Sequence, residues 1–138
     1  MQKSDWEIVW SEFLSVGVTE MDAEHRQFIA RVNELNRAIV ESEDKAQVAG
    51  AMERMMEEAA QHFSHEEELL ARWKYPDVQE HIAKHVQLSA QFEKAKTDFT
   101  QTDISFIWAL KALHLKQLLV EHLLKEDLKY RDFLWAQR

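Results

Sequence analysis

The stretches His62-Phe63-Ser64-His65-Glu66 and His81-Ile82-Ala83-Lys84-His85 decide the fold of this chain and the character of its interior. Residues four apart on a helix lie on one face, so His62 shares a face with Glu66, and His81 shares a face with His85. Each pair brings two side chains that can bind a metal ion to one point. Both stretches therefore predict helices whose inner faces carry metal ligands among the apolar residues.

The composition predicts a single all-α domain. The chain has 138 residues, with two Gly and one Pro to interrupt helices and no Cys for disulfides or thiolate ligands. The net charge of −8 argues against a nucleic acid or an anionic membrane surface as partner. No apolar run approaches the ~18 residues of a membrane span, and the polar N-terminus does not read as a signal peptide. We therefore expect a cytoplasmic protein without membrane insertion.

The hydrophobic pattern divides the chain into an arm and four helices. Residues 1–18 show no helical period and are rich in aromatic side chains, which indicates an extended arm packed along the outside. Apolar positions then recur every three or four residues over segments of about 19–40, 44–73, 77–99 and 103–136. With short connections between them, these segments predict an up-down-up-down antiparallel four-helix bundle with an N-terminal extended arm, forming one domain over 1–138.

Several polar side chains interrupt the apolar inner faces of these helices. A single buried histidine is usually a hydrogen-bonded core residue, but burying polar groups without partners costs about 1–3 kcal/mol each. Half a dozen would consume a typical domain stability of ~5–15 kcal/mol. The antiparallel topology brings these groups to one level of the bundle, where a metal centre satisfies all of them. The candidate ligands are His25, His62, Glu66, His81, His85, His122 and Asp127.

The number and kind of these side chains indicate a pair of metal ions. Imidazole and carboxylate ligands without cysteine favour iron, manganese or zinc. Around two six-coordinate ions, five imidazoles, two bridging carboxylates and one bridging oxygen leave one position open. Two competing motifs are excluded: no histidine follows a Glu by three residues, as in ferritin-like bundles, and the zinc-protease motif that begins at His65-Glu66 fails at Leu69.

At this point the residues resemble the hemerythrin family, in particular its single-domain bacterial members, the bacteriohemerythrins. The resemblance implies two iron ions joined by an oxo or hydroxo bridge, which bind O2 reversibly. It spans nearly the whole chain and rests on Trp10 with Ser15-Val16-Gly17-Val18, Met21-Asp22-Ala23-Glu24-His25, His62-Phe63-Ser64-His65-Glu66-Glu67, Tyr75-Pro76, His81-Ile82-Ala83-Lys84-His85 and His122-Leu123-Leu124-Lys125-Glu126-Asp127.

The resemblance also implies which side chains hold which iron. His81, His85 and His122 hold one ion; His25 and His62 hold the other, which keeps the open position; Glu66 and Asp127 bridge the two. On a regular helix, Glu126 would share the face of His122, whereas Asp127 lies about 140° away. The family's spacing is five residues, so we expect Asp127 and a local distortion of the helix.

Apolar side chains are expected to surround the open position, and each of them also suits ordinary core packing. The absence of an obvious proton donor among them favours reversible binding over O–O cleavage. Leu118 stands where some family members carry Trp. The candidates are Phe28, Phe63, Leu118, Leu119 and Leu124.

The remaining histidines and acidic residues are expected to lie outside the ligand set. We expect His65 and His114 on the surface or beside the ligands, and the acidic residues after Glu66 on a solvated face. The tryptophans are expected to serve packing: Trp6, Trp73, Trp108 and Trp135.

These features predict a protein that carries, stores or delivers O2 and is not an enzyme. A cytoplasmic oxidase is a candidate recipient of the O2, and a monomer is the expected state. Two alternatives use the same site: an enzyme that reduces peroxide or nitric oxide, and a sensor in which O2 or redox state moves the N-terminal arm. A structural bundle without metal is the remaining alternative.

Overall fold

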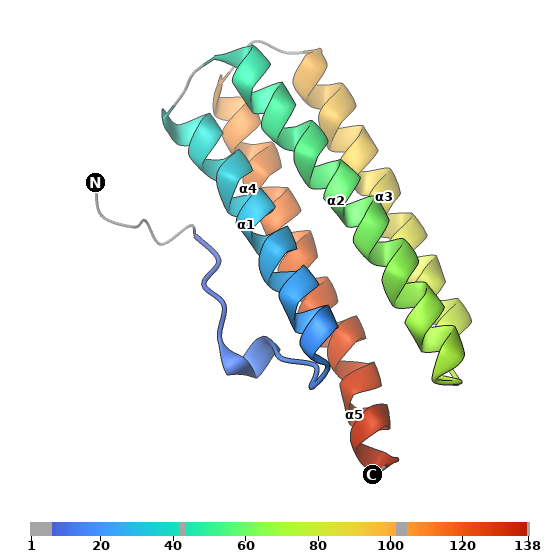
Figure 1. Cartoon of the computed structure of the whole chain (residues 1–138). Helices are drawn as coiled ribbons and strands as arrows, with labels where there is room; N and C mark the ends of the chain where they lie inside the picture. Colours follow the sequence, from blue (N-terminus) through green and yellow to red (C-terminus); the bar gives the residue numbers. More distant parts are fainter. Residues whose placement is uncertain (1–6, 42–43, 102–104, 138) are drawn as a thin grey trace.

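Four long helices run alternately up and down in the computed structural model, which describes residues 7–41, 44–101 and 105–137 (Figure 1). They are α1, Thr19–Glu41; α2, Lys45–Arg72; α3, Val78–Thr100; and α4, Ser105–His122. A π-helical segment, Leu123–Asp127, leads from α4 into α5, Leu128–Ala136. The predicted all-α four-helix bundle is confirmed, and the described residues contain no strand. The predicted start of the last helix, residue 103, lies outside the described residues.

The helices enclose two separate apolar clusters. α1 packs against α2 and α4, and α3 packs against the same two helices, so the four form a ring. The large apolar cluster includes Phe28, Val32, Leu35, Met52, Met55, Phe92, Phe99 and Leu119. The small apolar cluster contains Val16, Met21, Leu69, Leu70, Tyr75 and Tyr130.

The candidate ligands occupy the layer between these two clusters. On α1, His25 lies between Met21 of the small cluster and Phe28 of the large cluster. On α2, Glu66 lies between Phe63 of the large cluster and Leu69 of the small cluster. The bundle interior is therefore apolar at both ends of the ligand layer, which separates that layer from water along the bundle axis.

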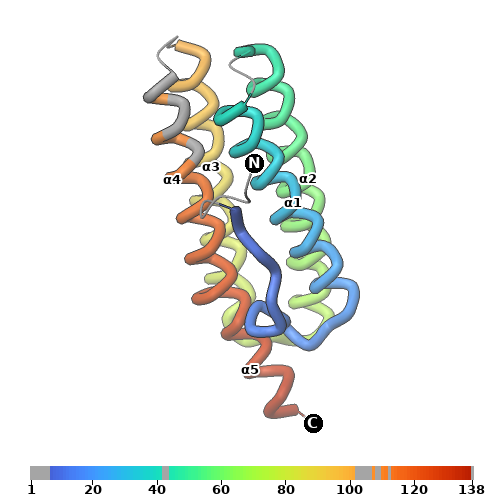
Figure 2. Tube along the Cα trace, turned by 90° about the vertical axis from the view of Figure 1, so that its left-hand side faces the viewer, coloured from blue at the N-terminus to red at the C-terminus, as the bar shows by residue number. Residues whose placement is uncertain are grey.

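The N-terminal arm runs along the outside of the bundle beside α1 (Figure 2). Its backbone is fixed at two points. Asn33 of α1 accepts a hydrogen bond from Ile8 N at 2.9 Å and donates one to Ile8 O at 2.8 Å, while Asp22 accepts from Val16 N at 2.9 Å. Between these points, Glu12–Leu14 form one 3-10 turn in the otherwise extended arm.

The turn between α2 and α3 reverses the chain within five residues. Lys74 adopts a left-handed conformation with φ of 58°, and Tyr75 N donates to Leu70 O at 3.0 Å, which satisfies a carbonyl at the end of α2. This turn leads directly into α3, whose first turns carry His81 and His85.

The tryptophans differ in how far they are buried. Trp73 packs against the small apolar cluster, as expected. Trp135, in the last turn of α5, is 63% exposed, although its indole Nε1 lies beside Gly17 of the arm. Trp6 and the side chain of Trp108 lie outside the described residues.

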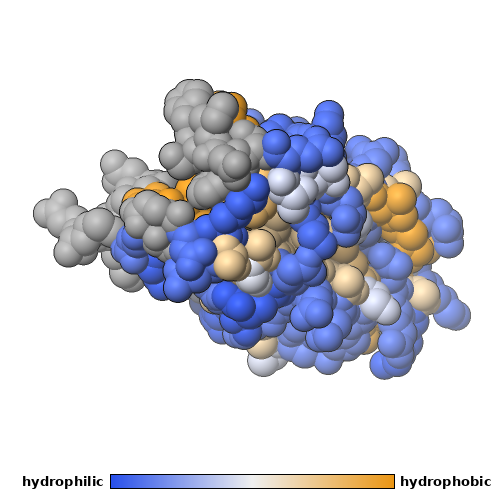
Figure 3. All heavy atoms as spheres, turned by 90° about the horizontal axis from the view of Figure 1, so that it is seen from above, coloured by the Kyte–Doolittle hydropathy of each residue, from blue (hydrophilic) through white to orange (hydrophobic). Residues whose placement is uncertain are grey.

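The described surface is mostly hydrophilic when viewed from the end opposite the small apolar cluster (Figure 3). Among the described residues, no helix combines the length and the apolarity that crossing a membrane requires.

Candidate metal centre

The seven side chains expected as ligands come together in the interior. None is more than 7% exposed. Their donor atoms form two groups, within each of which the atoms lie within 4.8 Å of one another, and the two groups share both carboxylates. The three-histidine group consists of His81, His85, His122, Glu66 and Asp127, and the two-histidine group consists of His25, His62, Glu66 and Asp127.

Glu66 presents one carboxylate oxygen to each group. Its Oε1 lies 2.8 Å from His81 Nε2 and 3.1 Å from His85 Nε2. Its Oε2 lies 3.1 Å from His25 Nε2 and 3.4 Å from His62 Nε2. A carboxylate that offers its two oxygens to two separate sets of nitrogens has the arrangement needed to bridge two ions.

Asp127 divides its oxygens in the same way. Its Oδ1 lies 3.2 Å from His81 Nε2 and 3.1 Å from His122 Nε2, and its Oδ2 lies 3.2 Å from His25 Nε2. Despite these short distances, neither oxygen of Asp127 has a hydrogen bond of acceptable geometry, and neither do the Nε2 atoms of His85 and His122. Buried polar atoms that converge without pairing fit a centre that takes its ligands from all of them.

A π-helical segment makes the contribution of Asp127 possible. The segment Leu123–Asp127 follows His122, and a π turn brings residues five apart to the same side of the helix. The structure therefore contains the distortion expected from the five-residue spacing. Glu126, the alternative on a regular helix, instead lies 3.4 Å from Lys129 Nζ, away from the cluster.

The carboxylates dominate the protonation of the buried histidines. Burial lowers the pKa of His25, but the close carboxylates of Asp127 and Glu66 outweigh burial and raise that pKa to about 10. The same competition raises the pKa of His81 to about 10. Without a bound cation these imidazoles are therefore protonated at neutral pH, and a metal ion must displace their protons in order to bind.

Glu66 is ionised in the buried layer and accepts a hydrogen bond from Tyr130. Burial raises the pKa of Glu66, but the four histidine rings that contact its oxygens, led by His25 and His62, hold that pKa well below its usual range. Tyr130 donates its hydroxyl hydrogen to Glu66 Oε2 at 2.8 Å. Burial and the charge of Glu66 raise the pKa of Tyr130 well above its usual value, so Tyr130 remains a donor.

Two further carboxylates contact histidines from outside the cluster. His85 Nδ1 lies 2.8 Å from Glu67 Oε2, and His62 Nδ1 lies 2.8 Å from Glu24 Oε1. The contact of Glu67 corrects the expectation that the acidic residues after Glu66 form only a solvated face, because the end of α2 faces the start of α3 at this level. Glu68 does point outward, where it pairs with Arg72 at 3.0 Å.

The two remaining histidines lie outside both ligand groups. His65 Nδ1 lies 2.5 Å from Glu24 Oε2, beside the cluster. His114 is exposed on α4.

Aromatic side chains cover the candidate ligands on the side of the large apolar cluster. Phe63 stacks on the ring of His85 with centroids 4.0 Å apart, and the Phe28 ring centroid lies 6.3 Å from that of His62. Both rings and Leu119 are buried, while Leu118 is partly buried against the large cluster. These four expected side chains pack in or against the apolar core beside the ligand layer.

Leu124 is the one expected wall residue that the structure places elsewhere. It is 38% exposed, whereas its neighbour Leu123 belongs to the large apolar cluster. The buried positions Leu119, Leu123 and Asp127 step by four residues, which leaves Leu124 on the outward side of the helix.

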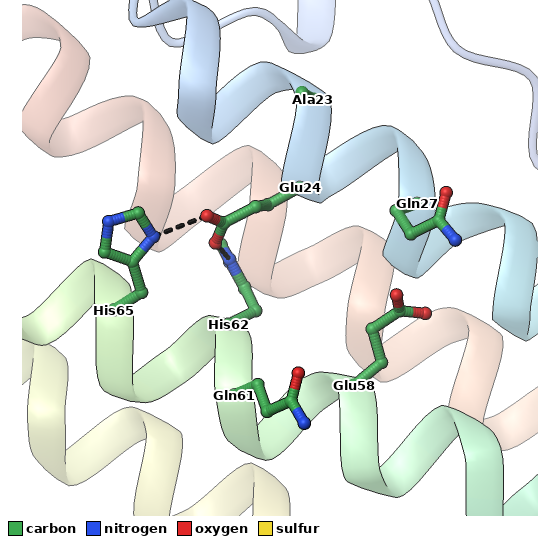
Figure 4. Close-up of a pocket in the computed structure, with 7 residues that line it drawn as sticks. All are labelled: Ala23, Glu24, Gln27, Glu58, Gln61, His62 and His65. Atoms are coloured by element: carbon green, nitrogen blue, oxygen red, sulfur yellow. Dashed lines mark hydrogen bonds and ion pairs between the residues drawn. The ribbon is translucent and has the colours of Figure 1, made fainter.

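A cavity of about 430 Å³ opens from the surface onto the two-histidine group between α1 and α2 (Figure 4). Its lining includes two glutamines and two glutamates, and the buried ring of His62 forms part of its inner wall. The lining residues are Ala23, Glu24, Gln27, Glu58, Gln61, His62 and His65.

Three residues of this site were not expected as part of it: Glu24, Glu67 and Tyr130. Tyr130 carries a usable signal, because it lies three residues after Asp127 and a helix places such residues on one face. Glu24 directly precedes the ligand His25, and Glu67 directly follows the ligand Glu66. On a regular helix, adjacent residues point about 100° apart, so neither shares the inner face of its neighbouring ligand. Each contacts a histidine of another helix, so no pattern within one segment reveals it.

The fold and the buried cluster together define a four-helix bundle with a histidine-rich candidate centre for two metal ions. The chain belongs to the hemerythrin family, since the model of the hemerythrin HHE cation-binding domain matches residues 16–134. It is similar to a bacteriohemerythrin from Stenotrophomonas maltophilia (strain R551-3), with 28% identity over 126 residues, which cover 91% of this chain and 80% of that protein. It is also similar to hemerythrin-like proteins from Naegleria gruberi and Naegleria fowleri, each 26% identical over 125 residues, or 91% of this chain and 92% of each relative.

Proposed function

We propose that this protein binds O2 reversibly at a di-iron centre held by His25, His62, Glu66, His81, His85, His122 and Asp127. The observation that carries the proposal is the pair of overlapping donor groups that share both carboxylates. A structural bundle has no use for five buried imidazoles whose nitrogens converge on the same four carboxylate oxygens. The family and the bacteriohemerythrin relative support the same function.

The donor set favours iron. Imidazole nitrogens and carboxylate oxygens without thiolates suit iron as well as manganese and zinc, and of these iron is the metal that exchanges electrons with O2 readily in such ligand sets. Two iron ions, joined by an oxo or hydroxo bridge, supply the electrons that let O2 bind and leave unchanged.

The chain makes the two halves of the site unequal. His81, His85 and His122 with the two carboxylates and a bridging oxygen would fill the coordination of one ion, whereas His25 and His62 with the same carboxylates would leave a position for an exogenous ligand at the other. Glu66 and Asp127 would hold both ions, since both carboxylates are fully buried and are contacted on both oxygens.

The surroundings of the open position restrict what happens to bound O2. Phe28 and Phe63 pack beside His62 with ring centroids 6.3 and 5.8 Å away, and they supply no proton. On the side that these two rings cover, exclusion of water and protons disfavours cleavage of the O–O bond and favours release of O2. The protein would then carry or store O2 as a cytoplasmic monomer and deliver it, for instance to an oxidase.

The proposal is tested by visible absorption of the iron-loaded protein, reduced without air, then exposed to O2 and returned to an O2-free atmosphere. We expect two irons per chain, a new absorption band with O2, and its loss when O2 is removed. Irreversible oxidation on first exposure would contradict reversible carriage and would favour the redox enzyme or the sensor. Steady turnover of peroxide or nitric oxide with an electron donor would identify the enzyme.

A further inference from the structure

We propose that Glu24, anchored by His65, is a positioning residue for the two-histidine half of the centre: it fixes the ring of His62 and sets the metal affinity and reduction potential of that half. This inference rests on the proposed function, because it assigns a role toward the same metal centre. It adds a residue that does not itself reach the ions.

The two carboxylate oxygens of Glu24 are used by two different histidines. Oε1 lies 2.8 Å from His62 Nδ1, and Oε2 lies 2.5 Å from His65 Nδ1 (Figure 4). Glu24 is on α1 and both histidines are on α2, so these contacts also join the two helices at the level of the ligand layer. Both oxygens of the Glu24 carboxylate are therefore engaged by histidine side chains.

The contact with Glu24 determines which nitrogen of His62 faces the metal centre. A carboxylate accepts hydrogen bonds and cannot donate them, so His62 Nδ1 carries the proton. The other nitrogen, Nε2, lies 3.4 Å from Glu66 Oε2 in the two-histidine group, with its lone pair free for a cation once a metal is bound. Glu24 therefore selects both the tautomer and the orientation that ligation requires.

A charged partner also changes the electronic character of the ligand. His62 Nδ1 donates to a carboxylate oxygen, Glu24 Oε1, at 2.8 Å, and the second oxygen of that carboxylate is contacted by His65 Nδ1. An imidazole that donates to an anion is a stronger electron donor through its other nitrogen. A stronger donor stabilises the more highly charged metal ion, which lowers the reduction potential.

The contact is selective within the two-histidine group. His25 Nδ1 is buried and has no hydrogen-bond partner among the described residues, so His62 is the member of that group held by an outer carboxylate. The three-histidine group has its own counterpart, since His85 Nδ1 contacts Glu67 Oε2 at 2.8 Å. One outer carboxylate thus serves each half, which provides a matched comparison for mutagenesis.

Glu24 lies in the wall of the surface cavity rather than in the apolar core. Its side chain is 30% exposed, so substitutions there should leave the large and small apolar clusters intact. Glu58 lines the same cavity but pairs with Arg31 at 2.9 Å, which makes Glu58→Gln a control for loss of a charge at this surface.

The test compares the full-length Glu24→Ala, Glu24→Gln, Glu67→Gln and Glu58→Gln variants with the unaltered protein. Iron per chain and Co²⁺ affinity against a chelator are measured together with the reduction potential of the iron-loaded protein. In Glu24→Ala we expect one ion to bind about 10–100-fold more weakly, the effect typical of losing an outer partner of a metal ligand. The second ion and the Glu58→Gln control should keep the affinities of the unaltered protein.

The conservative variant separates positioning from simple support of the fold. The amide oxygen of Glu24→Gln still accepts from His62 Nδ1, so this variant should recover most of the affinity lost in Glu24→Ala. Because the amide is neutral, the reduction potential of iron-loaded Glu24→Gln should be higher than that of the unaltered protein. His65→Ala should shift the potential in the same direction by a smaller amount, since Glu24 loses its anchor.

Unchanged affinity and potential in both Glu24 variants would overturn the inference, as would an equal loss in Glu58→Gln. If the unaltered protein binds no metal, the proposed function fails instead, so the two failures are distinguishable. Circular dichroism of every variant establishes that the bundle is folded before metals are compared.

Discussion

The large apolar cluster and the ligand layer are neighbouring parts of one bundle interior with opposite requirements. In the cluster, side chains such as Leu35 and Met52 are fully buried and need only neighbours of matching shape. In the layer, five imidazoles and two carboxylates are equally buried, but Asp127 and several ring nitrogens lack aligned hydrogen-bond partners. The apolar packing of the cluster is complete without a ligand, whereas the polar atoms of the layer need a bound metal ion to complete their contacts.

This difference indicates that two neighbouring regions of the bundle have separate roles: the large apolar cluster provides stability, and the ligand layer provides metal binding. Substitutions in the large apolar cluster should lower the free energy of unfolding and leave the metal site intact. Substitutions in the ligand layer should abolish metal binding and leave a folded bundle. The following predictions test that separation, from the largest expected effect to the smallest.

Glu66→Gln should have the largest effect on metal binding. The amide is nearly isosteric with the carboxylate but cannot offer a charged oxygen to each donor group, so both ions should bind more weakly by more than the about 10–100-fold expected for an outer partner. Chelator competition measures the affinities. Glu68→Gln is the control, because Glu68 pairs on the surface with Arg72. Two ions bound as tightly in Glu66→Gln as in the control would refute the role of the bridge.

Asp127→Ala should also release metal, whereas Glu126→Ala should not. The π turn places Asp127 in the cluster and leaves Glu126 beside Lys129. Metal analysis of the two purified variants makes the comparison. Full retention of two irons in Asp127→Ala would show that Asp127 is not a metal ligand.

Leu35→Ala should destabilise the bundle without changing its metal content. Leu35 is fully buried in the large apolar cluster, and truncating such a side chain costs about 2–5 kcal/mol of unfolding free energy. Urea unfolding of the metal-free protein measures the loss, and metal analysis should still give two ions per chain. A loss of metal in the folded variant would mean that the two levels are coupled.

The metal-free protein should become less stable as the pH rises from about 6.5 toward 10. Burial lowers the pKa values of His25 and His81, but the nearby carboxylates outweigh burial and raise both from 6.5 to about 10. The folded state thus binds more protons than the unfolded state in this range, so the contribution is complete below pH 6.5 and is lost toward pH 10. In the metal-free protein, the urea midpoint at pH 9 should be lower than the urea midpoint at pH 6.5. A midpoint that is level or rising would contradict the charge state assigned to these histidines.

Tyr130→Phe should have the smallest effect. It removes the hydroxyl that donates to Glu66 at 2.8 Å while keeping the ring in the small apolar cluster. We expect a loss of about 1.5–3 kcal/mol in the metal-free protein, the range for a hydrogen bond to a charged group. The loss should be smaller with metal bound, because the ions then neutralise Glu66. An equal loss in both states, measured by urea unfolding, would contradict that compensation.

Much of this arrangement follows from the sequence, because helical periodicity decides burial. The steps of three and four residues place His25, His62 and Glu66 on the same inner faces as their apolar neighbours, and the antiparallel topology brings those faces together. The choice of Asp127 over Glu126, and with it the distortion of the last helix, follows only from the resemblance to the hemerythrin family.

The remaining features depend on contacts between helices, which periodicity does not encode. Glu24 and Glu67 meet His62 and His85 only after α1 packs on α2 and α2 packs on α3. Leu124 was expected inside, but the register through the π-helical segment selects Leu123 instead.

Titration of the metal-free protein with Fe²⁺ in the absence of air tests the central claim most directly. Thermal unfolding and proton release are followed at each addition, since ions bound only by the folded state stabilise it and displace protons from the histidines. The account predicts a break at two ions per chain, accompanied by a rise in Tm and release of protons. A break at one ion, or a Tm that does not change with Fe²⁺, would contradict a dinuclear centre in the ligand layer.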